Sequence, residues 1–117
     1  MCRLVEYKNG RVADIKLKYI ENIARQAAKT RHITRIMLFG SALEERCRED
    51  SDVDIAVFGD LVGSRYYISG EYNDFQGGIF EYDSGQDYDI LYFPDGRECK
   101  APIMKNIENG LEIYRRP

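Results

Sequence analysis

The sequence predicts a mixed α/β (or α+β) fold, in which helices pack against one small mixed β-sheet. Segments with apolar residues at helical spacing alternate along the chain with short β-branched segments of strand length, and no internal repeat interrupts this alternation. The 117 residues suit one domain, which we expect to cover residues 1–117. A chain of this size buries about two-thirds of its unfolded surface, so a stable core needs no disulfide bonds.

The first part of the chain predicts a hairpin, a helix and a strand. Asn9-Gly10 lies between short apolar patches and is the strongest two-residue signal for a hairpin. From Asp14 to Lys29 the apolar residues recur at helical spacing, and we expect Asp14 to be the N-cap. Ile33 to Phe39 is mostly apolar and β-branched, which predicts a strand that runs into Gly40-Ser41.

The middle of the chain predicts a short helix around Ala42 to Cys47, followed by a strand over Asp52 to Phe58. The glycine-rich stretch from Gly59 to Gly78 is the least regular, and we expect a poorly formed helix somewhere within Tyr66 to Glu81. The glycines weaken this helix because each of them loses more backbone entropy on folding than any other residue would.

The last part of the chain predicts a strand, a helix and a closing strand. Tyr88 to Phe93 is apolar and aromatic, and it is stopped by the turn sequence Pro94-Asp95-Gly96. Pro102 suits the first turn of a helix and Gly110 suits the position after its C-cap. Leu111 to Tyr114 then predicts the strand that completes the sheet.

Charge and hydropathy exclude two classes of partner. The net charge is −3, so no basic field is available for nucleic acid, and we expect no direct nucleic-acid binding. No apolar run approaches the roughly 18 residues of a membrane span, and the first ten residues lack the apolar core of a signal peptide. We therefore expect a cytoplasmic protein without membrane contact.

The cysteines, the single histidine and the terminal arginines have no spacing that predicts chemistry. Cys2, Cys47 and Cys99 lack metal-ligand spacing and are interpreted as reduced thiols, with Cys47 partly buried. His32 is expected on the surface at the end of a helix, and Arg115-Arg116 in a solvated tail. The nine tyrosines are expected mainly in the core or an interface.

Gly40-Ser41 stands at a predicted strand-to-helix junction and is a candidate phosphate-binding turn. Glycine lets the backbone approach a ligand closely, and the free N–H groups at the start of a helix bind anions with support from the helix dipole. The serine hydroxyl adds one donor. The same pair is also typical of an ordinary turn followed by a helix N-cap.

Two carboxylates follow on one face of the next strand. The two-residue period places Asp52 and Asp54 on the same face, roughly 6 to 7 Å apart at their Cα atoms, and puts Val53, Ile55 and Val57 on the other. In a partly buried site such a pair repels itself unless a cation lies between, and Mg²⁺ prefers oxygen ligands and usually brings phosphates. The alternative is a pair of solvated acids at a sheet edge.

A third acid interrupts the strand over Tyr88 to Phe93. If this strand neighbours the one over Asp52 to Phe58, Asp89 can complete a three-carboxylate site. Asp87 has the same parity and competes for this role, but it lies nearer to the start of the strand, where we expect it to face solvent. We therefore favour Asp89.

The chain resembles the nucleotidyltransferase superfamily of DNA polymerase β in the spacing of its motifs. Gly40-Ser41 is followed after ten residues by Asp52-x-Asp54, and a further aspartate lies in a later strand. Within this superfamily the chain is similar to the minimal nucleotidyltransferases, small one-domain proteins often paired with a HEPN-domain toxin. The closing residues 109–114 also resemble that family's usual ending. The resemblance implies a nucleotidyltransferase fold over nearly the whole chain.

The resemblance also implies site residues and a reaction. In the family, three acids bind two Mg²⁺ ions, which by position assigns this role to Asp52, Asp54 and Asp89, with Asp89 helping to deprotonate the attacking hydroxyl. The Gly40-Ser41 turn would hold the β- and γ-phosphates of a nucleoside triphosphate. The reaction would transfer a nucleoside monophosphate, most often AMP from ATP, and release pyrophosphate.

The resemblance implies that the acceptor is a hydroxyl of a partner protein of the HEPN toxin class, which would make the chain an antitoxin. One alternative is a module of the same fold that binds its partner with little or no transfer. It is motivated by Glu44 and Glu45, which stand where many minimal nucleotidyltransferases have arginine and glycine, although Arg46 or Arg48 could offset their charge. A third reading is transfer to a small molecule such as an antibiotic, whose known enzymes carry an additional domain.

Overall fold

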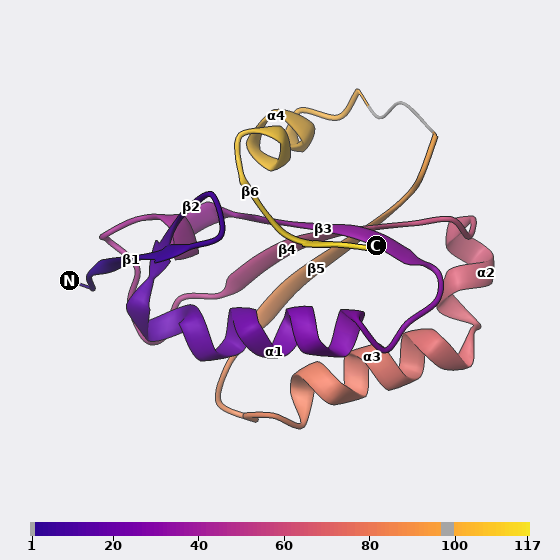
Figure 1. Ribbon diagram of the computed structural model, residues 1–117, viewed down its shortest axis with the longest axis horizontal. Helices are drawn as coiled ribbons and strands as arrows, with labels where there is room; N and C mark the ends of the chain where they lie inside the picture. Colours follow the sequence, from indigo (N-terminus) through magenta and orange to yellow (C-terminus); the bar gives the residue numbers. More distant parts are fainter. Residues whose placement is uncertain (1, 97–99) are drawn as a thin grey trace.

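A four-stranded sheet of order β5-β4-β3-β6 forms the centre of the computed structural model, which describes residues 2–96 and 100–117 (Figure 1). Its strands are β3 (Ile33–Phe39), β4 (Val53–Gly59), β5 (Tyr88–Pro94) and β6 (Leu111–Arg115). β4 and β5 run parallel, whereas β3 is antiparallel to both of its neighbours. The small mixed sheet predicted from the sequence is therefore confirmed.

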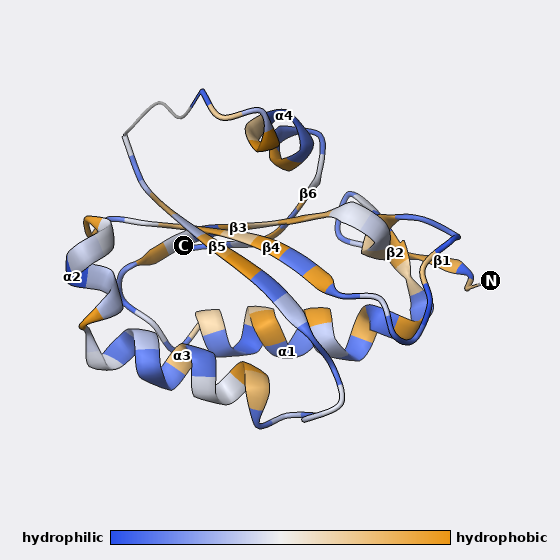
Figure 2. Cartoon of the chain, turned by 180° about the vertical axis from the view of Figure 1, so that it is seen from behind, coloured by the Kyte–Doolittle hydropathy of each residue, from blue (hydrophilic) through white to orange (hydrophobic). Residues whose placement is uncertain are grey.

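Helices cover both faces of this sheet. α1 (Leu17–Ala27) and α3 (Gly70–Phe80) lie on one face, and α4 (Ile103–Glu108) lies on the other (Figure 1). The short α2 (Gly63–Tyr67) precedes α3. Apolar and polar residues alternate along α1, as on an amphipathic helix, and its apolar side is buried (Figure 2).

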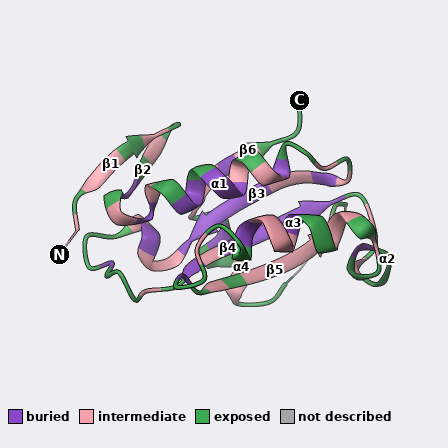
Figure 3. Ribbon diagram, turned by 90° about the horizontal axis from the view of Figure 1, so that it is seen from below, coloured by how far each residue is buried: buried purple, intermediate pink, exposed green. Residues whose placement is uncertain are grey.

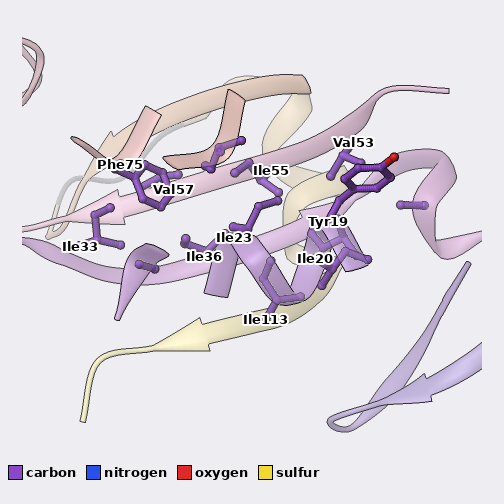
Figure 4. Packing of buried hydrophobic residues seen from close by; sticks show 14 of the residues in the cluster. Tyr19, Ile20, Ile23, Ile33, Ile36, Val53, Ile55, Val57, Phe75 and Ile113 are labelled. Atoms are coloured by element: carbon purple, nitrogen blue, oxygen red, sulfur yellow. The ribbon is translucent and has the colours of Figure 1, made fainter. Parts of the chain in front are cut away.

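The alternation along β4 divides the core into two layers. Val53, Ile55 and Val57 face α1 and α3, where they pack with residues such as Ile20 and Ile23 of α1 (Figure 4). The other face of β4 contributes Ala56 and Phe58 to a smaller cluster with Met37, Phe39 and Ile107. The predicted assignment of the two faces is confirmed, and each fully buried aliphatic side chain contributes about 1.5–3 kcal/mol of transfer free energy.

The N-terminal hairpin forms with a turn shifted by one residue. β1 (Leu4–Tyr7) pairs with β2 (Gly10–Ala13) so that Tyr7 lies opposite Gly10, which makes Lys8-Asn9 the turn instead of Asn9-Gly10. Lys8 accordingly adopts a left-handed φ of 53°. The Asn9-Gly10 pattern still predicted the hairpin correctly, because a turn at Asn9-Gly10 and a turn at Lys8-Asn9 connect the same two strands.

The first helix begins later than its apolar pattern suggests. One turn of 3-10 helix, η1 (Asp14–Lys16), precedes α1, and Asp14 caps neither helix with its side chain. Its carboxylate instead accepts a hydrogen bond of 3.2 Å from the N–H of Arg3. The prediction of Asp14 as the N-cap is wrong because the hairpin competes for the same oxygen.

The prediction of a short helix over residues 42–47 is wrong. The chain forms only a four-residue 3-10 turn, η2 (Gly40–Leu43), and then leaves the helical conformation at Glu44. The N–H of Cys2 donates to the carbonyl of Glu45 at 3.2 Å, which ties this segment to the start of the chain. Three successive exposed charged residues also leave no apolar face that a longer helix could bury.

The glycine-rich stretch forms two helices where one weak helix was expected. Ser69 separates them, and its hydroxyl oxygen accepts the N–H of Tyr72 at 3.1 Å as the N-cap of α3. The predicted strand over Tyr88 to Phe93, the helix after Pro102 and the closing strand are all confirmed, with β5 and β6 each one residue longer than expected.

The two terminal arginines are exposed, as expected, but hydrogen bonds hold the chain end against the rest of the molecule. Arg116 donates through its guanidinium to Asp60 at 3.0 Å and to the carbonyl of Arg31 at 2.6 Å. His32 contacts the same Asp60 carboxylate at 2.8 Å through Nδ1. Arg115 does remain at the surface, where it pairs with Glu112.

The cysteines follow the expected burial where they can be placed. Cys47 is buried, more fully than expected, whereas Cys2 is half-buried. Cys99 lies outside the described residues. Among the helices in the part of the chain that the structure describes, none combines the length and the apolar character needed to cross a membrane.

Candidate active site

Asp54 and Asp89 occupy paired positions on the parallel strands β4 and β5. Neighbouring strands lie about 4.8 Å apart, and paired positions point to the same face of a sheet, so the two carboxylates stand side by side. This is the face that α4 partly covers, because Asp54 shares its parity with Ala56 and Phe58. Asp54 is half-buried and Asp89 is exposed. Asp89 is carried by β5, which is an edge strand of the sheet (Figure 3).

The two remaining candidate acids lie before the strands. Asp52 is exposed and directly precedes β4. Asp87 is exposed and precedes β5, and its carbonyl accepts the N–H of Val53 at 3.1 Å. The structure therefore brings Asp89 beside Asp54, whereas Asp87 contributes its backbone to the pairing of the two strands.

Gly40 lies directly against the Asp54 carboxylate. It has a φ of 78°, in the left-handed region that favours glycine, and a Cβ at this position would overlap Oδ2 of Asp54. Ser41 follows, half-buried, in the η2 turn. Because η2 has only four residues, the dipole support expected from a longer helix is small, and an anion here would depend on individual N–H groups.

A cavity of about 540 Å³ opens between these residues and α4. Asp54, Asp89 and Gly40 lie on its sheet side, and Ile103, Asn106 and Asn109 line it from α4 and its C-cap. A site of this size accommodates a small molecule. Asp52 and Ser41 are not among the residues that line it.

The sequence reasoning missed both asparagines of this wall. Ile103, Asn106 and Asn109 recur every three residues, which places them on one side of a helix. Both asparagines are exposed in the cavity wall, so their amide groups are available to a ligand. The spacing was a signal that could have identified them.

Glu44 and Arg46 form the rim of the same cavity. Both are exposed, and the Arg46 guanidinium pairs with the Glu44 carboxylate. Glu44 and Glu45 both lie outside any helix and are exposed to solvent. Arg48 lies away from the cavity, 3.7 Å from Asp50, so Arg46 is the arginine placed to offset Glu44.

The electrostatics of the site favour a cation. The pKa of Asp54 is raised from its ordinary value of 3.8 to about 6, first by burial of the carboxyl and then by the negative charges of Asp89 and Asp52. All the charges that act on this carboxyl are negative. The three predicted acids are therefore close enough to repel one another, and a bound cation would relieve this repulsion.

The donor set fits Mg²⁺ that binds together with a phosphate ligand. Within residues 2–96 and 100–117, no three His, Cys, Asp or Glu side chains converge closely enough to hold a metal ion by themselves. Mg²⁺ is usually bound by one or two carboxylates, with waters and substrate phosphates as its other ligands. Asp54 and Asp89 supply such a pair, and Asp52 stands two residues before it.

Two larger cavities lie elsewhere among the described residues. One of about 750 Å³ lies beside η1 and the start of α1, and one of about 720 Å³ lies between α1 and α3. Neither is lined by any of the acids or the glycine described above. The cavity beneath α4 is thus the one that combines a glycine turn with paired strand carboxylates.

Comparison with protein families agrees with this site. A family model described as "Polymerase beta, Nucleotidyltransferase" matches residues 21–116, which run from within α1 to the end of the sheet. The match includes Gly40, Ser41 and the three acids. No curated protein gives a significant match to the chain.

Proposed function

Because the chain belongs to the polymerase beta nucleotidyltransferase family, we propose that it transfers a nucleoside monophosphate, AMP from ATP, to a hydroxyl group. The observation that carries this proposal is the pairing of Asp54 with Asp89 on neighbouring strands, against the Gly40 turn and inside a cavity of about 540 Å³. In this reaction the acceptor oxygen bonds to the α-phosphorus, the bond from that phosphorus to the bridging oxygen breaks, and pyrophosphate leaves.

The acids would hold Mg²⁺, as two ions in the family pattern, with Asp54 and Asp89 as the inner pair and Asp52 as the third ligand. When bound, Mg²⁺ would neutralise charge on the triphosphate and lower the pKa of the attacking hydroxyl. The fit rests on the pairing of Asp54 with Asp89 on neighbouring strands, and it is supported by the raised pKa of Asp54, which burial and then the charges of Asp89 and Asp52 cause.

The other residues of the cavity would bind and orient the nucleotide. The N–H groups of the Gly40-Ser41 turn would donate to phosphate oxygens, and this turn can lie against the Asp54 carboxylate because Gly40 carries no side chain. Phe39 and Ile103 offer apolar contacts to a base, and the amides of Asn106 and Asn109 offer both donors and acceptors to its polar edge or to the ribose. Asp89 would accept the proton of the attacking hydroxyl.

The acceptor is proposed to be a hydroxyl of a partner protein of the HEPN toxin class, so that the chain acts as an antitoxin in the cytoplasm. The similarity to minimal nucleotidyltransferases supports this partner. The exposure of Asp89 on the edge strand β5 supports a macromolecular acceptor, because a side chain of a docked protein could reach it (Figure 3).

A binding module without transfer is the second candidate, and Glu44 is the observation that favours it. A carboxylate at the rim of the cavity repels a triphosphate. The ion pair with Arg46 offsets this charge, which is why transfer remains the preferred function. A small-molecule acceptor has no specific support in the cavity.

The test is incubation of the chain with α-labelled ATP, Mg²⁺ and the product of the adjacent gene. Label should appear on the partner with the wild-type chain and disappear with Asp54→Asn. Stable complex formation without any label transfer, unchanged by Asp54→Asn, would support the binding module instead. Label that persists with Asp54→Asn would contradict the proposed site.

A further inference from the structure

Lys16 is a buried lysine outside the cavity beneath α4. Only 1% of its surface is exposed, although lysines are almost never buried unless their charge is satisfied. Its ammonium donates to the carbonyl of Glu49 at 2.9 Å, to the carbonyl of Ser51 at 2.7 Å and to Oε1 of Gln86 at 2.6 Å. All three of its donors are therefore used.

Gln86 extends these contacts to a second segment of the chain. It is 5% exposed, and its Nε2 donates to the carbonyl of Ser51 at 3.0 Å and to that of Asp87 at 2.6 Å. The same Asp87 carbonyl accepts the N–H of Val53 at 3.1 Å. Lys16 and Gln86, with the carbonyls of Glu49, Ser51 and Asp87, form one buried network, which we call the Lys16 clasp.

The Lys16 clasp joins the segments that lead into the two acid-bearing strands. Ser51 directly precedes Asp52, and Asp87 lies two residues before Asp89. Because β4 and β5 are parallel, both strands begin at the same end of the sheet, and the segments that lead into them meet there. A slip of one residue between the strands would turn a side chain to the opposite face, so the register here decides whether Asp54 stands beside Asp89.

The charge of Lys16 also interacts with acidic side chains close to the start of β4. Burial lowers the pKa of its ammonium, and the opposing charges that raise it include those of Asp50 and Asp52. Three hydrogen bonds to carbonyl oxygens offset much of the free energy of burying the charge. The ammonium of Lys16 thus holds the oxygens of Glu49, Ser51 and Gln86 close together through hydrogen bonds. An apolar side chain of the same length could not do this.

We propose that Lys16 is a positioning residue of the candidate active site, which through Ser51 and Gln86 holds Asp52 and Asp54 in place relative to Asp89 for cation binding. This inference rests on the proposed function, because it assigns the clasp to the cation that the three acids would hold. Lys16 itself touches neither the cavity nor the nucleotide.

Binding of Mn²⁺, with and without a non-hydrolysable ATP analogue, tests the proposal on the whole chain. Lys16→Met keeps a side chain of similar length but removes the donors, and it should weaken Mn²⁺ affinity about 10- to 100-fold, as loss of an outer-shell partner does at metal sites. Lys18→Met is the matched control, since Lys18 is exposed two residues away, and it should bind as the wild type does. Raised Mg²⁺ should restore transfer by Lys16→Met but not by Asp54→Asn.

A purely structural role predicts a different outcome. Lys16→Met would then unfold at a lower temperature but, while folded, would bind Mn²⁺ as tightly as the wild type, and that result would overturn the proposal. If Lys16→Met does not fold, Gln86→Leu decides, because it breaks the link between the two segments and should weaken Mn²⁺ binding to a similar degree. Unchanged affinity in folded Gln86→Leu would again overturn the inference.

The proposed function fails in a distinguishable way. Wild-type chain that binds no Mn²⁺ with or without the analogue would overturn the proposed function, and the role of the clasp with it. Wild-type binding lost in Asp54→Asn but equal in Lys16→Met and Lys18→Met would overturn the role of Lys16 alone.

Discussion

The backbone of Gly40 lies so close to the Asp54 carboxylate that a Cβ on Gly40 would overlap Oδ2. Gly40 directly follows β3 as the first residue of η2, with a left-handed φ of 78°, and Asp54 lies on the neighbouring strand, paired with Phe39. The turn and the acid are thus held together by the sheet itself. In the proposed reaction this contact would bring phosphate and cation to the same point.

Gly40→Ala should impair both folding and transfer. The added methyl group meets the carboxylate and a left-handed backbone, so we expect the free energy of unfolding to fall by about 1–3 kcal/mol. Transfer should fall at least about 10-fold as Asp54 is displaced. Gly77→Ala is the control: nothing lies within 4 Å of its added Cβ, and it should stabilise α3 by about 0.5–1 kcal/mol. Urea unfolding and a transfer assay measure both effects, and equal behaviour of the two variants would contradict the contact.

Asp89→Asn and Asp87→Asn separate the two candidates for the third acid. Asp89 lies in the cavity beside Asp54, and its loss should reduce kcat by about 10²-fold or more, the usual contribution of a general base. Asp87→Asn keeps the backbone carbonyl that pairs the strands, so kcat should change less than about twofold. The opposite ranking of the two variants would assign the role to Asp87.

The raised pKa of Asp54 predicts an unusual pH dependence of stability. A carboxyl whose pKa rises from 3.8 to about 6 on folding contributes stability below pH 3.8, which is lost as the pH rises through 6. Asp54→Asn should remove this loss, and without divalent cations it should be more stable than the wild type at pH 8 by about 1 kcal/mol after allowance for solvent screening.

Urea unfolding at pH 5 and pH 8, in the presence of a chelator, measures this difference. Asp60→Asn is the contrasting variant: burial raises the pKa of Asp60, but hydrogen bonds from Arg116 and His32 outweigh it and hold the pKa below its ordinary value. It should therefore destabilise the chain at pH 8. An Asp54→Asn variant that is less stable than the wild type at pH 8 would show that the carboxylate is satisfied without a cation.

The asparagines of α4 should affect nucleotide binding more than turnover. Asn106→Ala and Asn109→Ala each remove an amide that lines the cavity, and loss of one hydrogen bond predicts a rise in KM for ATP of about 2- to 10-fold. Asn73→Ala on α3, exposed and away from this cavity, should leave KM unchanged. A fall in kcat at constant KM would place the two asparagines on the acceptor side of the reaction.

The ion pair at the rim predicts a compensating double substitution. Arg46→Ala leaves Glu44 as an unpaired negative charge beside the phosphates and should raise KM for ATP severalfold, most strongly at low ionic strength. Glu44→Ala combined with Arg46→Ala should restore much of the affinity. If the double variant binds ATP no better than Arg46→Ala, Arg46 contacts the nucleotide directly.

Local patterns in the sequence predicted the strands of the sheet well. The alternation of β4 separates Val53, Ile55 and Val57 from Asp54, and the structure keeps these faces apart. The spacing of Gly40-Ser41 before Asp52-x-Asp54 pointed to Gly40 and Asp54, which lie against one another in the structure, whereas Ser41 and Asp52 do not line the cavity. These features depend on neighbours a few residues apart, which a sequence displays directly.

Features set by distant contacts could not be predicted. Lys16 has the sequence context of a surface lysine, and only the fold brings Ser51 and Gln86 to its ammonium. The short η2 turn depends on the contact between Cys2 and Glu45, 43 residues apart. The sequence likewise suggests that Arg116 belongs to a solvated tail, and only the fold brings Asp60 within hydrogen-bond distance of its guanidinium.

Comparison of α-labelled with γ-labelled ATP tests the central claim most directly. With Mg²⁺ and the acceptor protein present, the wild-type chain should transfer the α-label and release the γ-label as pyrophosphate, while Asp54→Asn does neither. Transfer of the γ-label to the acceptor, or transfer of the α-label that survives Asp54→Asn, would contradict nucleotidyl transfer by the site that Gly40, Asp54 and Asp89 form.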